Sequence, residues 1–263
     1  STLMDDLPSD TEAALSLLAL ESPRGATVRT KPVIPLHSLY AVVKSGTDVD
    51  QEVERLRLCN RVRVLQLPTP HGVEGVMLRT EDYEKLMHDD GENAVVACLH
   101  KLTGFNVGRD ELDAVLGVRA LELDAICERL LRAGWLIRGT PMGLSPDEPP
   151  PDMVSSWLWS MPGLGQVLNS LLRCREEVLK VLWKQKFHRS ARHIVETAPT
   201  VRKAITQGGL SFQLILRDLL GRRLVAEQRI GGSSSKVLQL TPSGAQMAHV
   251  SALCSSGGRK RKR

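Results

Sequence analysis

Residues 211–240 read SFQLILRDLLGRRLVAEQRIGGSSSKVLQL and contain a helix, a stop signal and a hairpin in direct succession. Ser211 can cap a helix over residues 212–220, and Gly221 can end it. Two β-rich runs, 224–230 and 236–240, then flank the turn-forming segment Gly-Gly-Ser-Ser-Ser. A helix that leads directly into a hairpin is the last part of a winged helix-turn-helix domain.

The residues before this stretch supply the other helices that such a domain needs. A helix over residues 166–185 places apolar residues on one side, namely Leu168, Leu171, Val178, Leu179 and Leu182. Thr200 can cap a second helix over residues 201–207, and Gly208-Gly209 makes the turn that follows. Residues 166–240 therefore have the complete order of a winged helix.

The same order of helices and strands occurs twice more towards the N-terminus. The first copy has its helices and strands at residues 12–20, 36–43, 50–58, 61–67 and 75–78. The second copy has them at residues 94–102, 110–116, 122–132, 135–138 and 156–159. Five prolines between residues 141 and 151 make the connection of the second hairpin a long loop. We expect Trp135, Trp157 and Trp159 beside this loop to be core or interface residues.

These repeats predict a mainly α fold with small β wings (α+β), built as three tandem winged helix-turn-helix domains. We expect the domains and the basic tail that follows them at residues 11–92, 93–162, 163–250 and 251–263.

Charge is distributed very unevenly along the chain. Residues 166–263 hold 19 Lys and Arg against 5 Asp and Glu, a formal charge of +14. The first 165 residues hold 16 Lys and Arg against 25 Asp and Glu, a formal charge of −9. A basic surface of this strength favours a polyanion, because binding releases the counterions condensed on it. The alternative is a solvated basic face followed by a localisation tail, since residues 259–263 read RKRKR.

Nucleic acid is the polyanion that we expect. Only Gln213, Leu214, Arg217 and Asp218 point outward on the helix over 212–220, which is a poor set for reading bases in the major groove. The cations beside that helix suit phosphate contacts with weak sequence preference. They are Arg173, Lys180, Lys184, Lys186, Arg189, Arg192, Arg202, Lys203, Arg222 and Arg223. Because single-strand binders present several stacking rings and only Phe187 lies in the basic segment, a duplex is favoured.

Enzymatic and metal sites find no support in the sequence. Gly163-Leu164-Gly165 is a fragment of a glycine-rich loop without the other motifs of a kinase, and no P-loop or G-x-S-x-G is present. Five widely spaced cysteines and seven histidines show no metal-ligand spacing. We expect no catalytic residue, no cofactor and no metal. No apolar run is long enough to cross a membrane, and a soluble protein is expected.

Several motifs resemble the serine/threonine-protein kinase 19 family, in order along residues 12–240. They are Val64-Leu65-Gln66-Leu67, Thr80-Glu81-Asp82-Tyr83, Trp159-Ser160-Met161-Pro162-Gly163-Leu164-Gly165, Arg173-Cys174-Arg175, Lys184-Gln185-Lys186-Phe187 and residues 221–225. The resemblance implies three winged helices and a nuclear protein that binds double-stranded DNA and is not a true kinase. It also implies a role in transcription-coupled repair, beside RNA polymerase II and repair-helicase assemblies.

By motif position, the resemblance assigns DNA contacts to Arg173, Arg175, Lys184, Lys186, Arg202 and Lys203. Trp183 stands where a further cation is expected, and the basic run is C-terminal here instead of preceding the first domain.

Our leading interpretation is a non-enzymatic scaffold that holds duplex DNA through its third domain and proteins through its first and second domains. The eleven DNA-binding candidates are Arg173, Arg175, Lys180, Lys184, Lys186, Arg189, Arg202, Lys203, Arg217, Arg222 and Arg223. The alternative is a winged-helix assembly module whose basic face binds an acidic protein or a second copy of the chain.

Overall fold

The computed structural model describes residues 8–21, 33–43, 45–69, 72–138, 156–229 and 236–257, with side chains as far as residue 250. Most of these residues are helical, and small antiparallel sheets account for the rest of the regular structure. This composition is compatible with the predicted α+β winged-helix class. The proline-rich loop, the hairpin tip at 231–235 and residues 258–263 of the basic tail predicted at 251–263 lie outside the described residues.

The chain divides into two compact units, and each is described by itself. Unit 1 contains residues 1–27, 34–49 and 166–263, and unit 2 contains residues 28–33 and 50–165. The boundaries fall within α2 (Gly46–Leu58) and near the start of α7 (Leu164–Trp183). The remaining elements of unit 1 are α1 (Asp10–Glu21), β1 (Ile34–Pro35), η1 (Leu36–Ala41), η3 (Lys186–His188), β7 (Arg189–Ala191), α8 (Arg192–Thr197), α9 (Pro199–Gly208), α10 (Phe212–Gly221), β8 (Val225–Arg229), β9 (Lys236–Leu240) and α11 (Pro242–Gly257).

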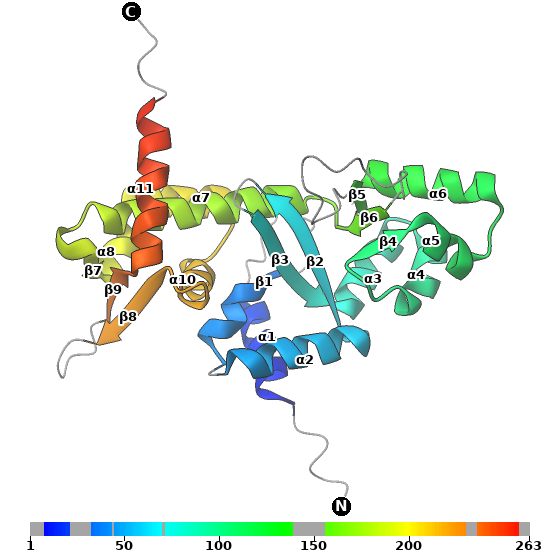
Figure 1. The fold of residues 1–263 in the computed structure, drawn as a ribbon, viewed down its shortest axis with the longest axis horizontal. Coiled ribbons are helices and arrows are strands. Elements are labelled where there is room, and N and C mark those ends of the chain that lie inside the picture. Colours follow the sequence, from blue (N-terminus) through cyan, green and yellow to red (C-terminus); the bar gives the residue numbers. More distant parts are fainter. Residues whose placement is uncertain are drawn as a thin grey trace, which may run out of the picture. The chain divides into compact units, whose positions relative to one another are not determined.

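The C-terminal part of unit 1 has the predicted helices followed by a hairpin (Figure 1). β8 and β9 pair antiparallel with Val225 opposite Leu240, which confirms the predicted hairpin. β7 joins the other side of β9, so the sheet has the order β7-β9-β8. The short strand β7 was not predicted.

Helix α10 packs against residues that precede it by more than 150 positions. It contacts η1 and α1, and its side chains Leu214, Ile215 and Leu219 are buried. At Gly221 the approach to η1 is so close that a Cβ atom would lie 1.7 Å from the carbonyl oxygen of His37. Glycine is required here by the closeness of the two backbones. Ser211 caps the helix as predicted, since its Oγ accepts a hydrogen bond from the Leu214 N–H at 3.2 Å.

Unit 2 contains a long hairpin and a second three-stranded sheet. β2 (Val62–Thr69) and β3 (Gly72–Arg79) pair along their whole length, with Val62 opposite Arg79. β4 (Asn106–Gly108), β6 (Ser156–Trp159) and β5 (Leu136–Arg138) form the second sheet in that order. The other elements are α3 (Thr80–Asp89), α4 (Asn93–Cys98), η2 (Leu99–Lys101), α5 (Arg109–Leu116) and α6 (Ala120–Ala133).

A buried aromatic cluster holds the long hairpin against the rest of unit 2. The Tyr83 hydroxyl donates a hydrogen bond to the Ser160 carbonyl oxygen at 2.8 Å, and its ring meets Trp135 edge to face. The Arg63 guanidinium is buried beside the rings of Tyr83 and Trp159 and donates to the Leu102 carbonyl oxygen. Burial lowers the pKa of Arg63. Trp135, Trp157 and Trp159 are all buried, which confirms the prediction that they are core residues.

Candidate nucleic-acid interface

The eleven predicted DNA-binding cations fall into two groups. Seven are exposed and form no ion pair with any other described residue: Arg173, Lys184, Lys186, Arg189, Arg202, Lys203 and Arg223. Four are engaged by acids of unit 1: Arg175, Lys180, Arg217 and Arg222. The exposed cations are hydrated and available to phosphate, whereas the engaged ones already have a partner.

Exposed cations follow each other closely after the end of α7. Lys184 comes directly after the last residue of the helix, and Lys186 and Arg189 follow within five residues. Between them Phe187 projects into solvent, with the Lys186 Nζ 5.1 Å and the Arg189 Cζ 5.6 Å from the centre of its ring. This segment is therefore basic and carries one exposed aromatic ring.

Helix α9 contributes two more exposed cations near its N-terminus. Arg202 and Lys203 are the fourth and fifth residues of the helix, and its first turn contains no acidic residue. The free N–H groups of a helix N-terminus carry a partial positive charge that attracts phosphate. Cations near a helix N-terminus interact unfavourably with the helix dipole. The presence of Arg202 and Lys203 here therefore favours a role in binding over one in helix stability. The helix starts at Pro199 with Ala198 as N-cap, and Thr200 is not the cap that the sequence predicted.

A shallow open groove brings the end of α7 and the start of α9 together. Its volume is ≈ 410 Å³, and its lining comes from α7 and the two residues after it, from α8 and from the start of α9. Lys184 and Thr200 both line it, as do Val181, Gln185, Ile194, Thr197, Ala198 and Pro199. We call the exposed cations on these neighbouring segments, Lys184, Lys186, Arg189, Arg202 and Lys203, the α7–α9 basic surface.

Arg175 does not belong to this surface. Its side chain is 3% exposed and its guanidinium donates hydrogen bonds to the Asp218 carboxylate, which is fully buried. Arg222 donates to the same carboxylate at 3.3 Å. The DNA contact assigned to Arg175 by motif position therefore has no support in the structure, because a phosphate cannot reach this guanidinium without opening the fold.

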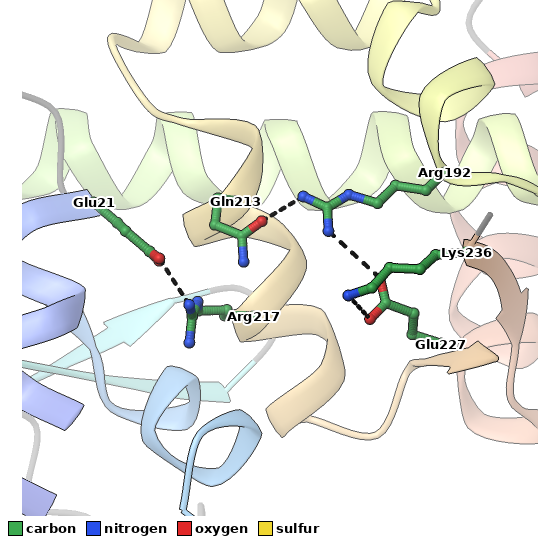
Figure 2. Close-up of polar contacts among 6 residues, drawn as sticks. All are labelled: Glu21, Arg192, Gln213, Arg217, Glu227 and Lys236. Carbon is green, nitrogen blue, oxygen red and sulfur yellow. Dashed lines mark hydrogen bonds and ion pairs between the residues drawn. The ribbon is translucent and has the colours of Figure 1, made fainter. Parts of the chain in front are cut away.

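The outward face predicted for α10 is also absent. Leu214 and Asp218 are buried, and Figure 2 shows that Gln213 and Arg217 are engaged by neighbours within unit 1. Arg192 donates to the Gln213 side-chain oxygen, and Arg217 donates to Glu21 of α1 at 2.7 Å. The helix that would enter the major groove in a winged helix is thus covered, and the prediction that Leu214 and Asp218 point outward is wrong.

Arg192 and Lys180 serve structural contacts as well. Besides Gln213, Arg192 pairs with Glu227 at 3.5 Å, and Lys236 pairs with the same carboxylate at 2.8 Å (Figure 2). Lys180 lies 2.8 Å from Glu176 and 3.4 Å from Glu177. Partial burial alone would lower the Lys180 pKa, but the two carboxylates outweigh it and raise the pKa. Lys180 is therefore partly neutralised, whereas Arg173 on α7 and Lys184 directly after it form no ion pair with another described residue.

The described residues offer nothing that resembles a metal centre, and none of their helices has the length and apolarity needed to cross a bilayer. Sequence reasoning had placed Phe187 in the basic segment but had not identified its exposed position. The exposed position of the ring follows from the left-handed backbone at Phe187, and no residue type nearby predicts that conformation.

Comparisons with known proteins identify relatives over most of the chain. The family model described as inactive serine-threonine protein kinase 19 matches residues 4–227. The chain is 25% identical over 229 residues to "Winged helix repair factor 1" of Homo sapiens, which covers 83% of this chain and 81% of that protein. It is 24% identical over 214 residues to the protein of the same name from Mus musculus, and this match covers 77% of this chain and 75% of that protein. The description of the family as inactive confirms the prediction that the chain is not an enzyme.

Proposed function

Because the chain belongs to the family described as inactive serine-threonine protein kinase 19, we propose that it is a non-enzymatic winged-helix repair factor that holds double-stranded DNA through phosphate contacts. The observation that carries this proposal is the α7–α9 basic surface, whose five cations are exposed and form no ion pair with another described residue. The names of the two mammalian relatives support the repair role.

In the proposed binding mode the protein contacts the DNA phosphates and does not recognise the base sequence. A winged helix that reads sequence places its recognition helix in the major groove, but α10 has buried apolar residues and engaged polar ones on all its sides. Lysine and arginine on a loop and at a helix N-terminus suit phosphate oxygens. Affinity should accordingly be steeply salt-dependent and nearly independent of DNA sequence.

Domain organisation and cellular role are parts of the same proposal. We propose winged-helix domains at residues 11–92, 93–162 and 163–250, since each of these ranges has a hairpin preceded by helices, although residues of the first range belong to both compact units. The net negative first 165 residues would engage proteins while the third domain holds DNA. By family resemblance we expect a nuclear protein that acts in transcription-coupled repair with RNA polymerase II and repair-helicase assemblies.

The decisive experiment is fluorescence anisotropy of the full chain with a 20-base-pair duplex, across a series of salt concentrations. The test variant combines Lys184→Glu, Lys186→Glu, Arg202→Glu and Lys203→Glu. The matched control combines Lys85→Glu, Lys101→Glu, Arg119→Glu and Arg138→Glu, four exposed cations of unit 2 that give the same change in net charge. We expect the test variant to lose binding and the control to keep most of it. Equal loss in both variants would show that only net charge matters, and unchanged binding in the test variant would refute the proposed surface.

A second candidate function is protein assembly, and α1 is the observation that favours it. Leu17 and Leu20 are exposed on this helix, and Leu17 borders a groove of ≈ 490 Å³ together with Asp10, Val42 and Asp48. An exposed apolar patch rimmed by acids suits a protein partner better than DNA. Light scattering of the full chain and of Leu17→Ser/Leu20→Ser tests whether the patch joins two copies, and the duplex assay tests whether DNA is needed at all.

A further inference from the structure

Phe187 is an exposed aromatic residue beside two cations of the α7–α9 basic surface, Lys186 and Arg189. It exposes 66% of its surface and is the only aromatic residue among the exposed large hydrophobic side chains of the described part of the chain. Leaving such a side chain in water forgoes the favourable free energy that its burial would contribute. An exposed ring among phosphate-binding cations therefore calls for a ligand with an apolar face.

The backbone that presents this ring is strained. Phe187 has φ 59 and His188 has φ 52, so two consecutive residues with bulky side chains adopt the left-handed region. This conformation is unfavourable for bulky side chains and persists only when the surrounding structure holds it. The His188 ring stacks on the Trp183 ring with centroids 4.4 Å apart, and its Nδ1 lies 3.0 Å from the Trp183 carbonyl oxygen. These contacts anchor the turn on the end of α7 while Phe187 remains in solvent.

Two cations of the kind that bind phosphate lie close to the Phe187 ring. Lys186 and Arg189 are within cation–π distance of it. Phosphates of a bound DNA would compete with the Phe187 ring for Lys186 and Arg189. Once these cations bind phosphate, one face of the ring is free for stacking. A base that stacks on an aromatic side chain raises affinity by about tenfold or more.

Only some DNA structures offer a base to this ring. In an intact duplex both faces of every internal base are covered by its neighbours, whereas a bulge or a junction with a single strand leaves one face open. A continuous single strand would need several rings in succession, and the basic surface has one.

We propose that Phe187 is a stacking residue that recognises one unstacked base, so that the chain prefers duplex DNA interrupted by a bulge or a single-strand junction over intact duplex. This inference rests on the proposed function, because the cations around the ring must first hold the flanking phosphates.

The test compares three DNAs of equal duplex length with the full chain: an intact duplex, the same duplex with a one-nucleotide bulge, and the same duplex with a single-strand junction. Phe187→Leu keeps an apolar side chain but removes the π face, and Phe187→Trp keeps the face. We expect wild type and Phe187→Trp to bind the interrupted DNAs about tenfold more tightly than the intact duplex. Phe187→Leu should bind all three DNAs with equal affinity.

A fluorescent base analogue, 2-aminopurine at the bulge, reports stacking directly. Its emission should change on binding wild type and stay as in free DNA with Phe187→Leu bound. Equal affinity of wild type for all three DNAs would overturn the inference and leave the proposed function standing. An equal loss of affinity for intact and interrupted duplex in Phe187→Leu would also overturn it, since the ring would then act by stabilising the fold. A wild-type chain that binds no duplex at low salt would refute both.

Discussion

The guanidinium of Arg175 on α7 and the carboxylate of Asp218 on α10 form a bidentate ion pair in the interior of unit 1, where neither side chain exposes more than 3% of its surface. This pair fixes the two helices at a single register. It also removes one of the predicted DNA contacts and explains why an acid lies in the middle of α10.

Breaking the Arg175–Asp218 pair should destabilise the protein strongly. Asp218→Asn removes the buried carboxylate that neutralises the Arg175 guanidinium, and the free energy of unfolding should fall by about 3–5 kcal/mol. Urea unfolding followed by circular dichroism measures this change. The double variant Arg175→Met/Asp218→Leu replaces the pair by apolar side chains and should recover most of the loss. A stable double variant that has lost duplex binding would contradict the structural role and return Arg175 to the DNA surface.

The thiol of Cys174 should be protected in the folded protein. Burial raises the pKa of Cys174 to about 11. Iodoacetamide at pH 8 should therefore modify the exposed Cys59 in the native state and reach Cys174 only after unfolding, as mass spectrometry of the digested protein can show. The folded state therefore holds the Cys174 thiol proton more tightly than the unfolded state does. The stability that the protonated thiol contributes is complete below pH 9 and is lost as the pH rises from about 9 to about 11. Rapid alkylation of Cys174 in the native state would contradict the burial.

Gly221→Ala should separate η1 from α10. The added Cβ would overlap the backbone of His37, which cannot move aside as a side chain can, so we expect a loss of about 1–3 kcal/mol. Gly165→Ala is the matched control, since its Cβ meets no atom within 4 Å and should be neutral or slightly stabilising. Hydrogen exchange should show faster exchange of the α10 amides in Gly221→Ala. If those amides remained protected, the packing of η1 on α10 would not depend on the glycine.

The sequence was sufficient for those parts of the fold whose signals are local. The hairpin of β8 and β9, the Ser211 cap and the buried tryptophans follow from turn residues, a capping hydroxyl and apolar alternation. The burial of α10 could not be predicted from local signals, because the residues that cover it come from α1 and η1, far earlier in the chain. Leu214 was the available hint, as an apolar side chain on a face predicted to be outward.

The candidate site shows the same division between local and distant information. The exposed cations of the basic surface were identified by charge density alone. Arg175 and Arg217 could not be separated from them, since their acid partners, Asp218 and Glu21, are distant in the sequence. Short elements such as α8 and β7 were missed because a few residues carry too little periodicity.

Lys180 on α7 and Lys184 directly after this helix should contribute very differently to DNA binding, although they are only four positions apart in the sequence. Lys180 is held between Glu176 and Glu177, so a phosphate gains little from a cation that is already neutralised. Lys184 is exposed and borders the groove that reaches the start of α9. Lys184→Ala should therefore lower the slope of log affinity against log salt by about 0.9, the value of one phosphate contact, and Lys180→Ala should leave it nearly unchanged. Anisotropy titrations of the two variants at four or more salt concentrations measure both slopes under identical conditions. Equal slopes in the two variants would mean that ion pairing along α7 does not decide which cations meet the DNA, and the division of the eleven candidates into free and engaged groups would lose its functional meaning.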